Sequence, residues 1–164
     1  MNLPAGFRYS ATYAGIRKER RDDLALIVSD AAASAAAVFT QNRVQAAPVR
    51  VARAHLAKSQ GAVRALLLNA GNANCATRTG DAVAEACCEA AAAHLGVPPE
   101  LIFPASTGVI GVELDPSLIT SRLPELVAAL SPDRFEDVAR AILTTDTRMK
   151  TASAAVVPRS VSAC

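Results

Sequence analysis

Short apolar runs alternate along this chain with longer segments that carry apolar residues at helical spacing. Two runs, at residues 24–28 and 36–40, predict a pair of neighbouring strands, with Ser29 and Asp30 opening the loop between them. A third run, at residues 65–69, is uninterrupted and soon followed by a glycine. That pattern is typical of a central strand.

Three segments have the apolar spacing of helices. The first covers residues 81–95, and Gly96 is placed to end it. Asp115 and Pro116 predict the start of the second, as N-cap and first helical residue. Its apolar stripe comprises Ile119, Leu123, Leu126, Val127 and Leu130. A Ser-Pro pair at residues 131–132 opens the third. The positions of this helix that should face inward are Phe135, Val138, Ala139 and Ile142.

Together these elements predict an α/β fold in one domain, residues 1–164, and the apolar fraction of 51% suffices for a real core. A net charge of +2 offers no basic face, so nucleic acid is not an expected partner. The mixed-charge run at residues 17–23 should form a solvated loop. There is no apolar run of about 18 uncharged residues and no signal-peptide pattern. We therefore expect a cytoplasmic protein that does not associate with membranes.

Four cysteines are present, at Cys75, Cys87, Cys88 and Cys164, and no two have the C-x-x-C spacing. Only two histidines could complete a metal site, so the pattern favours unreactive thiols and no metal. Cys87 and Cys88 are adjacent in a predicted helix, where neighbouring side chains diverge. A disulfide between them is not expected.

The first segment that could take part in catalysis follows a fourth predicted strand at residues 101–103 and reads Pro-Ala-Ser-Thr-Gly-Val-Ile-Gly. At a strand end, the hydroxyl of Thr107 and the N–H of Gly108 could point to one place and stabilise a developing oxyanion. The alternative is an ordinary turn, because Ser-Thr-Gly is common loop chemistry. From the residues alone, the turn is favoured.

Two further polar segments could bind a substrate. Residues 69–74 place three asparagines around one glycine, where the amides could hydrogen-bond a ligand or adopt left-handed turns. Residues 144–150 gather threonines with one acid and two bases, which could hold a zwitterionic amino acid or simply end a helix. Neither segment has a phosphate-binding glycine pattern.

Taken in order, these segments resemble the ornithine acetyltransferase family, the glutamate N-acetyltransferases of arginine biosynthesis. The matching segments are residues 4–7, 14–17, 23–27, 38–42, 47–49, 69–74, 106–111 and 144–147. The resemblance implies the layered α/β architecture of this self-processing family rather than a Rossmann sheet. It also implies a precursor that cuts itself into α and β chains. The threonine freed at the β N-terminus takes acetyl from N-acetylornithine and passes it to glutamate.

The resemblance also assigns roles to residues. It places the oxyanion hole at Thr107 and Gly108 and a substrate contact at Thr144. The family continues into a glycine-rich segment with a substrate-binding lysine and an Ala-Thr cleavage point, and neither is present here. Lys150 belongs to the preceding motif and is not that lysine. The chain thus corresponds to an α-type portion without its nucleophile, and alone it should be inactive.

The same resemblance implies the partners. A β chain carrying the nucleophile is expected in an α2β2 assembly, with no cofactor and with acetyl-coenzyme A as a possible donor substrate. Two other interpretations stay open. One is a non-catalytic binding or scaffold protein derived from the same fold, which would also lack a nucleophile. The other is an unrelated nucleotide-binding α/β domain using residues 69–74, which ranks last because no phosphate-binding motif accompanies them.

Overall fold

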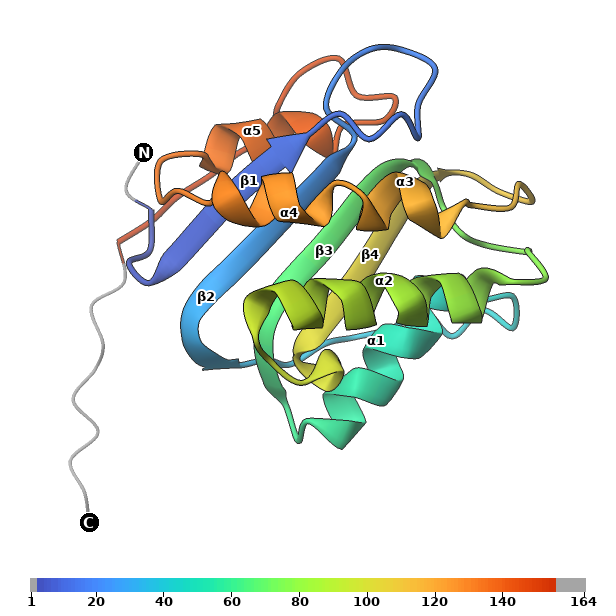
Figure 1. Ribbon diagram of the computed structural model, residues 1–164, viewed down its shortest axis with the longest axis horizontal. Helices are drawn as coiled ribbons and strands as arrows, with labels where there is room; N and C mark the ends of the chain where they lie inside the picture. Colours follow the sequence, from blue (N-terminus) through green and yellow to red (C-terminus); the bar gives the residue numbers. More distant parts are fainter. Residues whose placement is uncertain (1–2, 156–164) are drawn as a thin grey trace.

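The computed structural model describes residues 3–155, and its centre is a four-stranded sheet in the order β1-β2-β3-β4 (Figure 1). The strands are β1 (Phe7–Thr12), β2 (Leu24–Ser34), β3 (Ala62–Asn72) and β4 (Ile102–Val109). The first three pair antiparallel, and β4 runs parallel to β3. A parallel pair needs a crossover connection. Helix α2 (Gly80–Leu95) and the short 3-10 helix η1 (Pro99–Leu101) provide it.

The sheet has helices on both faces. Helix α2, α3 (Pro116–Thr120) and α4 (Leu123–Ala128) cover one face (Figure 1). Leucines of β2 and β3 form the main core there with Cys88 and Leu126. Helix α1 (Ala47–Lys58) contributes Val51 to that core. On the other face, α5 (Phe135–Ala141) packs on β1 and β2, with the Phe135 ring edge-on to Tyr9 at 5.4 Å between ring centroids.

The predicted pairing of residues 24–28 with residues 36–40 is wrong. Strand β2 continues through Ser29 and Asp30 without a turn, and it lies between β1 and β3. Residues 36–40 form no strand, and the Val38 side chain is 100% exposed. The alanine-rich run offers little apolar surface to bury, whereas residues 24–28 pair with β1 and β3 and contribute side chains to both core clusters.

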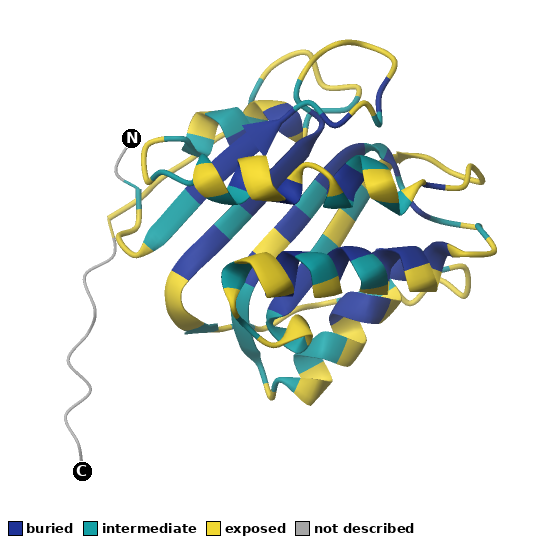
Figure 2. Cartoon of the chain, in the orientation of Figure 1, coloured by how far each residue is buried: buried dark blue, intermediate teal, exposed yellow. Residues whose placement is uncertain are grey.

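The central strand and the first helix are confirmed. Residues 65–69 lie inside β3, between β2 and β4, and buried residues alternate there with more exposed ones (Figure 2). Helix α2 covers the predicted residues and ends at Gly96, whose backbone is left-handed with φ of 66°. Strand β1 and helix α1 were not predicted.

The second predicted helix is two helices. Asp115 does cap the start, because its Oδ1 accepts a hydrogen bond from the Ser117 N–H at 2.8 Å. The helix is interrupted between α3 and α4, where Pro124 occupies the first turn of α4, but all five residues of the predicted stripe pack in the main core. Proline lacks an N–H and its ring clashes with the preceding helical turn, so a continuous helix cannot pass through it.

The third predicted helix forms, but it starts later. Helix α5 begins at Phe135 instead of directly after Pro132. It buries Val138 as expected and Ala141 instead of Ile142, whose side chain is 40% exposed. The inward stripe is therefore shifted by one residue at its C-terminal end.

Candidate functional site

Strand β4 runs through the Ser-Thr-Gly motif, so the predicted turn at this point is wrong. Ser106, Thr107 and Gly108 pair in register with residues 69, 70 and 71 of β3. The motif therefore belongs to the ladder that joins the two parallel strands. Its geometry is fixed by the sheet and not by a mobile loop.

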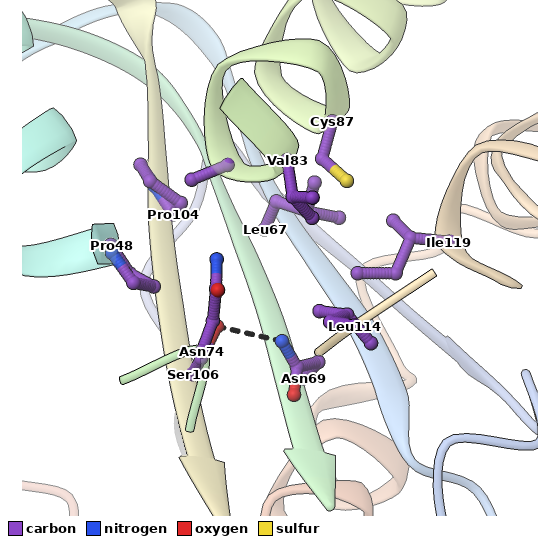
Figure 3. A pocket seen from close by; sticks show the side chains of 11 residues that line it. Pro48, Leu67, Asn69, Asn74, Val83, Cys87, Pro104, Ser106, Leu114 and Ile119 are labelled. Atoms are coloured by element: carbon purple, nitrogen blue, oxygen red, sulfur yellow. Dashed lines mark hydrogen bonds between the residues drawn. The ribbon is translucent and has the colours of Figure 1, made fainter. Parts of the chain in front are cut away.

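Ser106 and Thr107 face opposite sides of the sheet, because side chains alternate along a strand. Ser106 points toward α2, where its Oγ accepts a hydrogen bond from Asn69 Nδ2 at 2.6 Å (Figure 3). Both side chains line a small enclosed cavity of about 20 Å³ together with Val83 and Cys87. Thr107 is exposed on the other face. Ser106 thus contributes to packing inside the protein, and Thr107 is accessible to a ligand.

Gly108 lies against Gly71 in the neighbouring strand. Its φ is +134°, and a Cβ built there would lie 2.3 Å from the Gly71 carbonyl carbon. No other residue fits this approach without separating the strands. The Val109 carbonyl accepts a bond from the Ala73 N–H at 2.9 Å, so residue 109 faces β3. Alternation then turns the Gly108 N–H toward the free edge of β4.

An open cleft of about 740 Å³ lies beside this part of the sheet. Thr107 and Gly108 line it together with Thr144, which follows α5 in the sequence. Cationic side chains of the loop before β2 also line it, with one carboxylate, that of Glu19. The structure thus brings the three residues singled out in the sequence to one cleft, although they come from two distant segments.

The asparagines of residues 69–74 hold the end of β3 and the turn after it. Asn72 Oδ1 accepts from the Asn74 N–H at 2.7 Å, and Asn72 Nδ2 donates to the Val112 carbonyl at 3.0 Å. Asn74 Nδ2 donates to the Gly80 carbonyl at 2.8 Å. All three asparagines are buried. The Asn72 and Asn74 amides stabilise the backbone, whereas Asn69 bonds the Ser106 side chain, and only Asn72 also lines the cleft.

The Thr144 segment is less enclosed. Thr144 is half-buried, Thr145 is exposed, and Arg21 Nη2 donates to the Thr144 carbonyl at 3.2 Å. Lys150 pairs with Asp146 at 2.6 Å on the surface. Its ammonium group is thus engaged within its own segment.

The charged run at residues 17–23 is not solvated throughout, which corrects the sequence-based expectation. Asp23 is completely buried and Arg17 is only 8% exposed. The Asp23 carboxylate accepts from the Ala14 N–H at 2.7 Å and the Arg17 N–H at 2.9 Å. These two residues were missed because their neighbours carry charge and are exposed. The only signal was that Asp23 directly precedes a buried strand.

The cysteines in the described part of the chain are free thiols. Cys87 and Cys88 are buried and form no disulfide, as expected, and burial raises the pKa of each to about 12. Cys164 lies outside residues 3–155. Within those residues, no three histidine, cysteine or carboxylate side chains gather as a metal would require, and no helix has the length and apolar character to span a membrane.

Comparisons with known proteins match nearly the whole chain. The model of the ArgJ family matches residues 8–163. Two proteins named "Arginine biosynthesis bifunctional protein ArgJ" are similar to it. That of Nitratidesulfovibrio vulgaris is 46% identical over 158 residues, which are 91% of this chain and 38% of that protein. That of Thermus thermophilus is 48% identical over 157 residues, 95% of this chain and 40% of that protein.

Two solved structures share the fold. Superposition on the arginine biosynthesis bifunctional protein ArgJ of Bacillus halodurans gives a TM-score of 0.80 at 34% identity, covering 88% of this chain and 75% of that one. The ornithine acetyltransferase of Mycobacterium tuberculosis, complexed with ornithine, gives 0.82 at 34% identity, covering 89% and 79%. The chain spans about two fifths of the length of the sequence relatives above. From this fold and these matches, the chain belongs to the ArgJ family.

Proposed function

We propose that this chain supplies the oxyanion hole and part of the substrate pocket of a glutamate N-acetyltransferase. The complete enzyme moves an acetyl group from N-acetylornithine to glutamate. Family membership and the names of the relatives support this reaction class. The observation that carries the proposal is that Thr107, Gly108 and Thr144 line one cleft.

The oxyanion hole needs two donors at one point. The Thr107 hydroxyl lies on the exposed face of the sheet, and the Gly108 N–H lies at its free edge beside the same cleft. The sheet holds both before substrate arrives, so little reorganisation is needed when charge develops on the carbonyl oxygen. One such donor typically lowers the activation barrier by roughly 3 kcal/mol.

The nucleophile comes from a β chain, as the hydroxyl of its N-terminal threonine. That hydroxyl attacks the acetyl carbon of N-acetylornithine and gives its proton to the threonine's own α-amino group. The carbonyl oxygen becomes negative and is held by Thr107 and Gly108. The C–N bond then breaks, and the ornithine nitrogen leaves with that proton. The glutamate amine attacks the resulting ester by the same route, releasing N-acetylglutamate and restoring the threonine.

The remaining lining of the cleft suits amino-acid substrates. Lys18 and Arg21 offer positive charge to a carboxylate, and the Thr144 hydroxyl offers a hydrogen bond. Val109 and Val112 present apolar surface to the methylene groups of ornithine or glutamate. These steps use no cofactor, and acetyl-coenzyme A would enter only as an alternative donor. The β chain completes the pocket in an α2β2 assembly.

Reconstitution tests the proposal. This chain is produced alone and together with the remainder of the protein, and transfer of labelled acetyl from N-acetylornithine to glutamate is measured. We expect N-acetylglutamate only from the combined material, with an acetyl-threonine in the companion chain seen by intact mass. Combined material that folds and binds ornithine but transfers no acetyl group would instead support a non-catalytic derivative.

A further inference from the structure

We propose that Arg17 is a positioning residue that fixes the Thr144 segment relative to the Thr107–Gly108 pair. The expected effect of Arg17 on turnover rests on the proposed function. The contacts by which Arg17 joins two segments of the chain, which we call the clamp, do not depend on that function. A single side chain joins the end of β3 to the chain that leaves α5. These are the two parts of the molecule that meet at the cleft.

One end of the clamp lies on β3. A Cβ at Gly71 would come within 2.9 Å of Arg17 Cγ, so the arginine side chain lies directly over that glycine. Arg17 Nε donates a hydrogen bond to the Ala70 carbonyl. Ala70 and Gly71 are the register partners of Thr107 and Gly108. The arginine is therefore one strand away from the proposed oxyanion hole.

The other end lies at the C-terminus of α5. Arg17 Nη2 donates to the Leu143 carbonyl and also approaches the Ala141 carbonyl at 3.4 Å. Carbonyls at a helix C-terminus lack helical partners, and a cation there is favourable. Leu143 directly precedes Thr144, so the bond sets where the Thr144 backbone begins.

The backbone of Arg17 is also fixed in place. Its backbone N–H donates to the buried carboxylate of Asp23, which fixes the loop from which the side chain extends. Among residues 3–155, the guanidinium has no carboxylate within salt-bridge distance, and the buried Nη1 has no hydrogen-bond partner. Burying a cation in this way is costly, and an apolar side chain of similar size would pack at lower cost. The position of the guanidinium, more than stability, is what the residue provides.

Hydrogen exchange tests the clamp without any catalytic assay. In the complete protein, Arg17→Met removes the positive charge and the guanidinium N–H donors while keeping most of the side-chain volume. We expect faster amide exchange in the peptide covering residues 141–147 and little change in the core of α2. Arg122→Met is the matched control, because Arg122 is exposed on the surface and pairs only with Glu125. Unchanged exchange at residues 141–147 in Arg17→Met would overturn the clamp.

A double-mutant cycle tests the link to function. We expect Arg17→Met to lower kcat/KM about 10- to 100-fold, since a misplaced substrate contact can cost about 100-fold in rate. Thr144→Val should lower it too, and the double variant should be no worse than the poorer single variant, because both act through Thr144. Arg17→Lys keeps the positive charge but loses the planar set of guanidinium N–H donors, so it should restore only part of the kcat/KM that Arg17→Met loses. Additive losses would overturn the proposal.

The two proposals can fail separately. If the wild-type complete protein transfers no acetyl group, the proposed function is wrong, and the exchange measurement still decides whether Arg17 holds the segment. If transfer occurs and the cycle is additive, the function stands and the positioning role of Arg17 is wrong.

Discussion

At the scale of single residues, adjacent positions on β4 have different tasks. Ser106 accepts a bond from buried Asn69 and lies over the enclosed cavity beneath α2, whereas Thr107 is open to the cleft. The period of two along a strand makes this separation possible within one dipeptide. Substitution at Ser106 should therefore affect mainly stability, and substitution at Thr107 mainly turnover.

Ser106→Ala leaves the Asn69 amide without its hydrogen-bond partner in a buried place. A buried polar group left unsatisfied costs about 1–3 kcal/mol, and denaturant unfolding of the complete protein should show a loss of that size. Turnover of the folded variant should change little. A stable Ser106→Ala protein with strongly reduced turnover would show that Ser106, not Thr107, faces the chemistry.

The pKa of the buried cysteines gives a second prediction at this scale. Burial raises the pKa of Cys87 and Cys88 from 9.0 to about 12, so both remain protonated thiols at pH 8. In a Cys164→Ser background, iodoacetamide at pH 8 should modify the partly exposed Cys75 and spare the other two until the protein unfolds. Because the folded pKa is the higher one, their stabilising contribution is complete below pH 9 and declines as pH rises toward 12. Equal labelling of all three cysteines in the native protein would contradict this burial.

At the scale of elements, the contact between β3 and β4 determines the shape of the site. Gly71 and Gly108 allow the two strands to approach closely where the motif passes the cleft, and Arg17 lies over Gly71 and lines the same cleft. Helices α2, α3 and α4 bury the opposite face of the sheet. The site is thus a property of a strand pair and not of a loop.

Gly108→Ala should disturb that strand pair. The added methyl group would meet the Gly71 backbone at 2.3 Å, and overpacking of this kind costs about 1–3 kcal/mol or more. Gly6→Ala is the matched control, because Gly6 also has a positive φ but has open space around it. Chemical denaturation should show a clearly larger loss for Gly108→Ala. Equal losses would mean that only backbone strain, and not the close approach, requires glycine at 108.

At the scale of the whole molecule, the sequence predicts the α/β class, the central strand and α2, because these features rest on local periodicity. It does not predict β1 or the partners of residues 24–28, which depend on contacts between distant segments. The break at Pro124 was visible in the sequence, but the apolar stripe continues across it and concealed it.

The site, too, has residues that the sequence predicts and residues that it does not. Thr107, Gly108 and Thr144 were found because their motifs resemble a known family, and only the fold shows that they line one cleft. Arg17 and Asp23 were missed because a buried charge looks like an exposed one when its neighbours are charged, and only Asp23, which directly precedes a buried strand, has a signal in the sequence. Their burial follows from the backbone groups of Ala14, Ala70 and Leu143, which lie far apart in the chain.

The central claim is that the hydroxyl of residue 107 stabilises the oxyanion, and the turnover of Thr107→Ala measures it most directly. In the complete enzyme we predict that kcat falls by roughly 100-fold, corresponding to about 3 kcal/mol, while KM changes little. Thr107→Ser keeps the hydroxyl and should retain most of the activity. Thr120→Ala, on α3, serves as a control for threonine loss elsewhere. A Thr107→Ala enzyme that turns over at the wild-type rate would contradict the account.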